Sequence, residues 1–151
     1  MIAAFLAAQL EQAEDITARR LAIWDRYHAW AAPLEVHGLL RRPLIPISCT
    51  HNAHMYYLLL QGLEQRSAFI AHMKDAGVAC VFHYIPLHSS PAGQRLGRAA
   101  GMLRHTDQIS DCLVRLPLWL GLEEHLEPLL ETAHRALVET ASPVARAQNH
   151  I

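Results

Sequence analysis

The first 32 residues contain neither proline nor glycine, and this uninterrupted stretch constrains the fold more than any other feature. Apolar side chains recur in it at mostly helical spacing, with acidic and arginine residues between them. The pattern predicts one long helix from Ile2 to about Trp30, ended by Pro33. No capping residue precedes it, so we expect either a helix that packs against another part of a larger protein or an ordinary frayed terminus.

The remaining chain reads as a mixture of short strands and helices. Proline-rich residues 34–50 predict an irregular connection with one short strand, and residues 84–93 predict a loop. We expect Pro117 to place the third predicted strand, Arg115–Leu120, at a sheet edge, because proline has no backbone N–H for the hydrogen bonds between strands. Thr106 or Asp107 is the expected cap of a helix through Cys112. The remaining expected elements are strands Met55–Leu60, Val78–Phe82 and Arg115–Leu120 and helices Glu64–Ala76 and Glu123–Thr140. The fold class is therefore α+β, with a long N-terminal helix followed by a small sheet of three or four strands covered by helices.

Composition and charge exclude several classes of function. The formal net charge is −1, and no basic run exceeds an arginine pair, so we expect neither nucleic acid nor an anionic membrane surface as a partner. No apolar run approaches the ~20 residues that span a bilayer. The three cysteines form no C-x-x-C pair and the N-terminus has no signal-peptide pattern, which together favour reduced thiols in a cytoplasmic protein.

The segment His83–His88, HYIPLH, is the best candidate for a binding site. It places two imidazoles and a phenol at the end of a predicted buried strand, on a backbone stiffened by Pro86 and Pro91. Such groups donate to sugar hydroxyls or pair with phosphate oxygens. An ordinary polar surface loop fits the pattern equally well.

Two further histidine features are weaker. Asn52 and His54 precede the first predicted strand and can converge on the same pocket. His51 and His54 form an H-x-x-H pair, and a total of 11 histidines invites a metal hypothesis. Zinc sites need three or four ligands, so we favour histidines near solvent over a metal pair.

Four segments together make the chain resemble a known family. They are the helix AAFLAAQLEQAEDITARRLAIWDRY, the stretch HNAHMYY from His51 to Tyr57, the string VFHYIPLHSSPAG from Val81 to Gly93, and TDQISDCLVRLPL from Thr106 to Leu118. The chain resembles the C-terminal region of fold-type I, pyridoxal phosphate (PLP)-dependent nucleotide-sugar aminotransferases. Within that family it is most similar to the transaminases that form dTDP-4-amino-4,6-dideoxygalactose. The resemblance extends from about Ile2 to Leu137.

The resemblance implies a large PLP-binding domain that lies outside this chain and a small C-terminal domain that closes one side of the active site. It divides this sequence into an inter-domain helix (residues 1–32), a small α/β domain (33–140) and a flexible tail (141–151). The resemblance also implies a homodimer whose two subunits complete each other's sites, with glutamate as the donor of the amino group to a 4-keto-6-deoxy nucleotide sugar in surface polysaccharide synthesis. His83, Tyr84 and His88, with Asn52 and His54, are the implied substrate contacts. Distant relatives show the motif at a one-residue offset, so Phe82 remains an alternative contact.

The lysine content departs from the family pattern. PLP transamination needs a lysine amine to hold the cofactor and shuttle a proton. The only lysine here is Lys74, near the predicted end of a helix beside Gly77, a solvated position. We therefore expect no catalytic residue and no bound PLP in this chain alone, which would be inactive by itself.

Two other interpretations stay open. The chain can be a stand-alone α+β module that binds a small ligand and pairs through its long helix. It can also be a histidine-rich metal enzyme with His51, His54, His83 and His88 as ligands.

Overall fold

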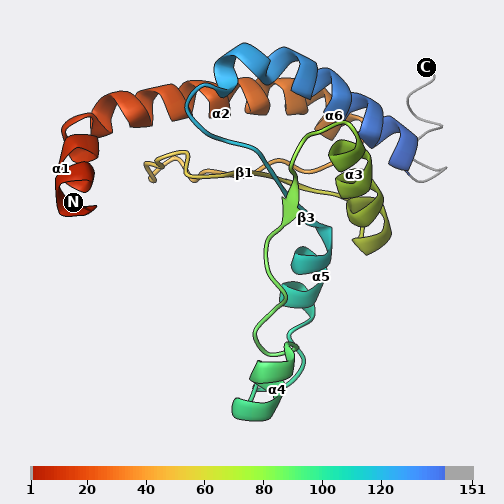
Figure 1. Cartoon of the computed structure of the whole chain (residues 1–151). Coiled ribbons are helices and arrows are strands. Elements are labelled where there is room, and N and C mark those ends of the chain that lie inside the picture. Colours follow the sequence, from red (N-terminus) through yellow and green to blue (C-terminus); the bar gives the residue numbers. More distant parts are fainter. Residues whose placement is uncertain (1, 142–151) are drawn as a thin grey trace.

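The computed structural model describes residues 2–141, which form helices around a three-stranded sheet (Figure 1). The α+β class predicted from the sequence is confirmed. The helices are α1 (Ile2–Glu11), α2 (Ala13–Val36), α3 (Leu63–Asp75), α4 (Pro91–Leu96), α5 (Arg104–Cys112), the 3-10 turn η1 (Leu122–His125) and α6 (Leu126–Thr140). The strands are β1 (Tyr56–Leu59), β2 (Val81–Phe82) and β3 (Leu113–Leu116).

The N-terminal helical segment differs from its prediction at two places. It breaks at Gln12, and α1 turns away from α2 there (Figure 1). The prediction that Pro33 ends the helix is wrong, because α2 continues through this proline to Val36. Gly38 lies just beyond the helix end, and its φ of 71° allows its amide to bond the Glu35 carbonyl and the next amide to bond the Leu34 carbonyl. This paired arrangement is a Schellman motif, which favours glycine at the left-handed position.

The sheet has the order β1-β3-β2, and both neighbours of β3 are antiparallel to it. The predicted edge position of the third strand is therefore wrong: β3 lies in the centre. It ends at Leu116, so Pro117 follows its last residue and removes no ladder hydrogen bond. The short strand expected within residues 34–50 is reduced to a single bridge between Arg41 and Leu59.

The core lies between one face of the sheet and helices α2, α3 and α6. Alternate residues of β1 and β3 are buried, as expected for strands with one face against the core. Figure 1 shows α2 and α6 side by side along one side of the molecule. The largest fully buried side chains are Tyr27, Tyr56, Phe69, Ile23, Leu39, Leu58, Met73, Leu122, Leu126, Leu137 and Val114.

The segment between β2 and β3 extends away from α2 and α6 and carries α4 and α5 (Figure 1). Helix α4 falls where the sequence indicated only a polar loop; Ser90 caps it by accepting a hydrogen bond from the Gly93 amide. The expected cap of α5 is wrong. Leu103 occupies the capping position without a side-chain hydrogen bond, and Thr106 and Asp107 lie inside the helix.

Most of the predicted tail, residues 142–151, lies outside the described residues. Among residues 2–141, no helix is long and apolar enough to cross a membrane.

Candidate functional site

The loop from His83 to His88 leaves β2 and runs beside α5, where it borders a cavity of about 720 Å³. The wall combines loop residues with one face of α5. The side chains are mostly apolar, with a few polar groups among them, which is the usual composition of a small-molecule site. The lining residues are His83, Tyr84, Ile85, Pro86, Leu87, His105, Thr106, Ile109, Ser110 and Leu113.

His83 and Tyr84 lie together on this cavity. Their rings meet edge to face with centroids 4.7 Å apart. The Nδ1 atom of His83 is buried and has no hydrogen-bond partner among the described residues. The guanidinium of Arg115, on β3, lies 5.7 Å from the centre of the Tyr84 ring, and the tyrosine itself is 67% exposed. The pair therefore presents the His83 ring and an accessible phenol to the cavity, while the Nδ1 atom itself is buried.

His88 lies on a different cavity from His83. This second cavity, of about 750 Å³, adjoins the first because Leu87 and Thr106 line both. The Nε2 atom of His88 is 3.0 Å from Oδ1 of Asp107 on α5, which makes an ion pair when the imidazole is protonated. The two histidines of the motif thus have different surroundings: His88 is engaged by a carboxylate and His83 is not.

Asn52 and His54 are held against α2. Both the backbone amide and the ring Nδ1 of His54 lie 3.2 Å from Oδ1 of Asn52. Arg20 donates to the carbonyls of Ala53 and His54 at 3.0 and 2.7 Å. Neither Asn52 nor His54 lines either cavity beside the HYIPLH loop, so the structure brings His83 and Tyr84 together without them.

The histidines near Trp24 have packing contacts. His51 tilts against the Trp24 ring and His28 stacks on it, each with centroids 4.6 Å apart. Within residues 2–141, no group of three or more histidine, cysteine, aspartate or glutamate side chains is arranged to hold a metal ion.

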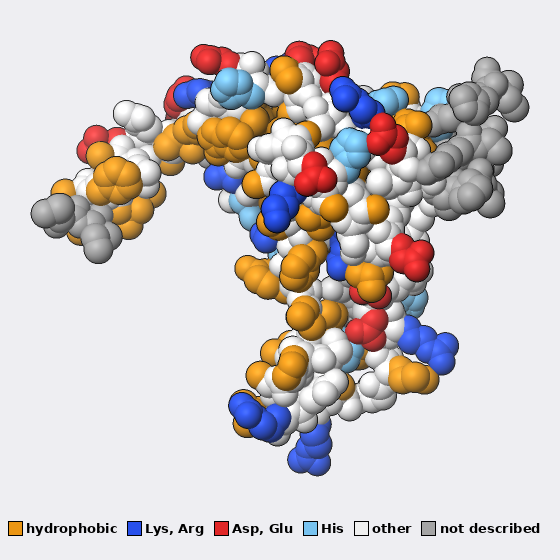
Figure 2. Space-filling view, turned by 45° about the vertical axis from the view of Figure 1, so that its right-hand side comes forward, with side chains coloured by type: hydrophobic (Ala, Val, Ile, Leu, Met, Phe, Trp, Pro, Cys, Tyr) orange, Lys and Arg blue, Asp and Glu red, His pale blue; other side chains and the backbone are white. Residues whose placement is uncertain are grey.

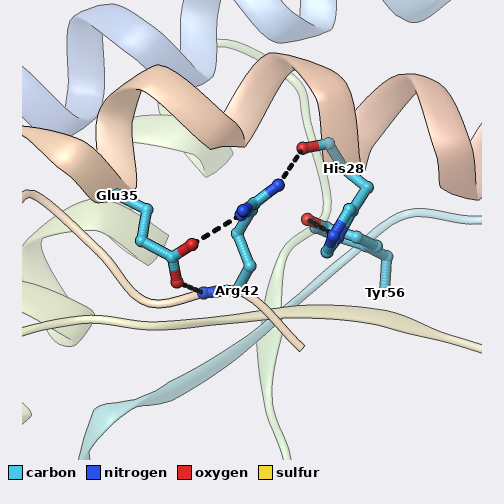
Figure 3. A network of polar contacts seen from close by, with 4 residues as sticks. All are labelled: His28, Glu35, Arg42 and Tyr56. Carbon is cyan, nitrogen blue, oxygen red and sulfur yellow. Dashed lines mark hydrogen bonds and ion pairs between the residues drawn. The ribbon is translucent and has the colours of Figure 1, made fainter. Parts of the chain in front are cut away.

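A half-buried polar network that sequence reasoning missed joins the end of α2 to the segment before β1 (Figure 3). The Glu35 carboxylate accepts hydrogen bonds from the backbone amide and Nε of Arg42, both at 2.7 Å, and these bonds lower its pKa. Arg42 also donates to the His28 carbonyl at 3.0 Å. Desolvation, followed by the nearby Arg42 charge, lowers the pKa of His28, whose Nδ1 lies 3.5 Å from the Tyr56 hydroxyl. The network ties elements together and borders neither loop cavity.

Lys74 does not provide a site for PLP. It is exposed in the last turn of α3, as the sequence predicted, and it borders neither cavity beside the loop. PLP is held through a lysine amine in a closed, oriented pocket. The residues of this chain therefore do not fit the attachment of PLP, and we assign no step on that cofactor to them.

Comparison with known proteins identifies the family. The family model for the DegT/DnrJ/EryC1/StrS aminotransferase family matches residues 1–128. The fold is similar to the aminotransferase TlmJ from Streptoalloteichus hindustanus (23% identity, TM-score 0.76, 90% of this chain and 36% of that chain). It is also similar to the putative sugar aminotransferase Spr1654 from Streptococcus pneumoniae in its PMP-form (25% identity, TM-score 0.72, 89% and 34%). A third similar structure is that of DesV from S. venezuelae (22% identity, TM-score 0.71, 99% of this chain and 36% of that chain). This chain spans about a third of the length of these proteins. It belongs to the DegT/DnrJ/EryC1/StrS aminotransferase family.

Proposed function

We propose that this chain is the C-terminal segment of a PLP-dependent nucleotide-sugar aminotransferase, and that it supplies contacts to the sugar while another segment holds the cofactor. The complete enzyme would move an amino group from glutamate to the 4-keto carbon of a 6-deoxy nucleotide sugar. Among such reactions we favour the formation of dTDP-4-amino-4,6-dideoxygalactose for surface polysaccharide. We expect the enzyme to work in the cytoplasm as a homodimer.

The observation that carries this proposal is the pair of His83 and Tyr84 on an apolar cavity. The His83 ring lines this cavity, where an imidazole can form a hydrogen bond with a sugar hydroxyl. The apolar wall suits the methyl group and ring face of a deoxysugar, and the exposed phenol reaches a second hydroxyl. Family membership supports the amino-transfer chemistry, and the exposed position of Lys74 supports a cofactor site outside this chain.

The decisive experiment is a chimera in which this chain replaces the matching third of Spr1654. We expect the chimera to bind PLP and to transfer the amino group of glutamate to a 4-keto-6-deoxy nucleotide sugar. His83→Ala and Tyr84→Phe should each raise KM about tenfold while PLP content stays unchanged, because each removes one hydrogen bond to the sugar. His134→Ala, which removes a histidine from α6, is the matched control. A folded, PLP-loaded chimera that aminates no nucleotide sugar would contradict the proposal.

The chain alone gives a second test of the cofactor assignment. Mixed with PLP, it should develop no visible absorbance band that depends on Lys74, so the spectra of the wild type and Lys74→Ala should coincide. A band that disappears in Lys74→Ala would show that this chain does hold the cofactor.

A stand-alone ligand-binding module remains the second candidate, because residues of this chain alone form both cavities beside the loop. Calorimetry with dTDP-glucose separates the two functions. Tight binding to the isolated chain favours the module, whereas no measurable heat favours an incomplete site that needs the PLP-binding segment.

A further inference from the structure

Helix α5 contacts the HYIPLH loop at both of its ends. Ser110 donates its hydroxyl to the Tyr84 carbonyl at 2.8 Å, and Oδ1 of Asp107 lies 3.0 Å from Nε2 of His88. Asp107 and Ser110 are three residues apart and therefore share one face of the helix. We propose that they are positioning residues, which hold the loop between them in the conformation that presents His83 and Tyr84 to the cavity. The identity of the ligand in this inference rests on the proposed function.

The Ser110 end of this arrangement is itself anchored to α3. The Ser110 carbonyl accepts a hydrogen bond of 2.6 Å from Nη1 of Arg66. The same guanidinium lies 5.3 Å from the centre of the Phe82 ring, immediately before the loop. Arg66 therefore connects the start of the loop and the helix that holds it, so that α3, α5 and the loop form one contact network.

The His88 end of the loop is also held by the start of α4, whose backbone packs closely against the Leu87 carbonyl. Ser90 donates its hydroxyl to the Leu87 carbonyl at 2.8 Å and accepts from the Gly93 amide at 3.0 Å. A Cβ atom at Gly93 would lie 1.6 Å from the Leu87 carbonyl oxygen, so only glycine fits this contact. The turn into α4 is thereby packed directly against the residue that precedes His88.

These contacts explain how an exposed loop can serve as a recognition surface. Tyr84, Ile85 and Leu87 are 67%, 60% and 78% exposed, so core packing contributes little to their order. A loop that becomes ordered only on binding loses conformational entropy, which weakens the binding. A loop that is already held in place avoids this loss. Asp107 and Ser110 keep the loop ordered through their contacts from α5, which is itself a regular helix.

The test uses the 151-residue chain without ligand and follows the aromatic ring signals of His83 and Tyr84 by NMR. In Asp107→Ala/Ser110→Ala, both sets of signals should shift and broaden, while the core rings of Tyr27 and Tyr56 keep their wild-type positions. Asp107→Asn/Ser110→Thr keeps an acceptor and a donor at the two places and should restore both loop rings. Asp111→Ala removes an exposed carboxylate from the same helix and should change neither.

His88→Ala breaks the same contact from the loop side, and it replaces the double variant if that variant loses its core signals. It should shift the Tyr84 and His83 rings as Asp107→Ala does, and combining the two substitutions should add little further change. Unchanged His83 and Tyr84 rings in these variants, or an equal change in Asp111→Ala, would overturn the inference.

A titration with dTDP-glucose keeps the two proposals separate. If the wild type binds, the Asp107→Ala/Ser110→Ala variant should bind about tenfold more weakly, and an equal affinity would overturn the positioning role. If the wild type does not bind, the result weighs against the sugar site in the isolated chain, and the ligand-free ring signals alone decide the inference about Asp107 and Ser110.

Discussion

Tyr27 joins the long helix to the sheet through a single side chain. Its ring is fully buried and stacks on Tyr56 with centroids 5.0 Å apart, and its hydroxyl donates to the Pro117 carbonyl at 2.8 Å. Burial raises the pKa of the phenol far above its ordinary value, so the group remains a neutral donor. A phenol on α2 thus satisfies the carbonyl that immediately follows the last residue of β3.

We expect Tyr27→Phe to lower the free energy of unfolding by about 1 kcal/mol, because the Pro117 carbonyl loses its partner while the ring stacking is retained. Urea unfolding monitored by circular dichroism measures this difference. Tyr57→Phe, which removes a phenol from the half-buried face of β1, is the matched control. Equal losses of unfolding free energy in the two variants would show that the hydrogen bond to Pro117 adds no specific stability.

At the scale of elements, the junction between α2 and β1 depends on Glu35 and Arg42. The carboxylate binds the backbone amide and the guanidinium of the same arginine, next to the bridge between Arg41 and Leu59. The chain therefore turns from the helix to the edge of the sheet through an ionic contact of partly exposed side chains. Its contribution to stability must depend on the protonation of Glu35.

The pKa of Glu35 is lowered in the folded state, so its contribution is present above the ordinary value of 4.5 and is lost as pH falls through the lower folded value. At pH 7, Glu35→Gln should cost about 0.5–1 kcal/mol, since partial exposure screens the pair. Below pH 4.5 the wild type should lose stability more steeply than Glu35→Gln. Thermal unfolding across this range measures the effect, with Glu131→Gln on α6 as control. Parallel pH curves for wild type and Glu35→Gln would contradict this assignment.

At the scale of the whole molecule, exposed apolar side chains gather on α1 and on the projection that carries α4 and α5 (Figure 2). On α1, Phe5, Leu6 and Leu10 are 67%, 52% and 64% exposed. Leu87, Leu96 and Met102 on the projection are each more than three-quarters exposed. Apolar surfaces of this kind mark places of association with another protein segment. This agrees with a chain that spans about a third of its relatives.

We expect the isolated chain to associate at high concentration, measured by sedimentation velocity, because α1 presents its apolar side chains to water. Phe5→Ser/Leu6→Ser/Leu10→Ser should weaken this association at least about tenfold, since burying those side chains contributes a few kcal/mol. Ile47→Ser, which removes an exposed side chain outside α1 and the projection, should have little effect. A chain that stays monomeric at every concentration would contradict this prediction.

Residue types and periodicity were sufficient to predict the α+β class, β1, α3 and most of α6. In these segments the local conformational preference of the residues agrees with the observed structure. The residues of the HYIPLH loop also indicate a candidate site, and that assignment stays a prediction. Local reasoning failed where a proline lies close to the end of an element. α2 continues through Pro33 to Val36, just before the turn at Gly38, and Pro117 does not push β3 to an edge because the strand ends before it.

Sequence by itself determined which chemical groups the candidate site contains: two imidazoles and a phenol on a proline-stiffened loop, with the single lysine on a helix end elsewhere. Only the tertiary structure decided how these groups are arranged. It divides the two histidines between adjacent cavities and pairs His88 with Asp107, a residue that local reasoning assigned to a helix cap. It also holds Asn52 and His54 against α2, away from the loop cavities. The reason is physical: spacing along the chain specifies local conformation, whereas the packing of α5 against the loop sets which side chains meet.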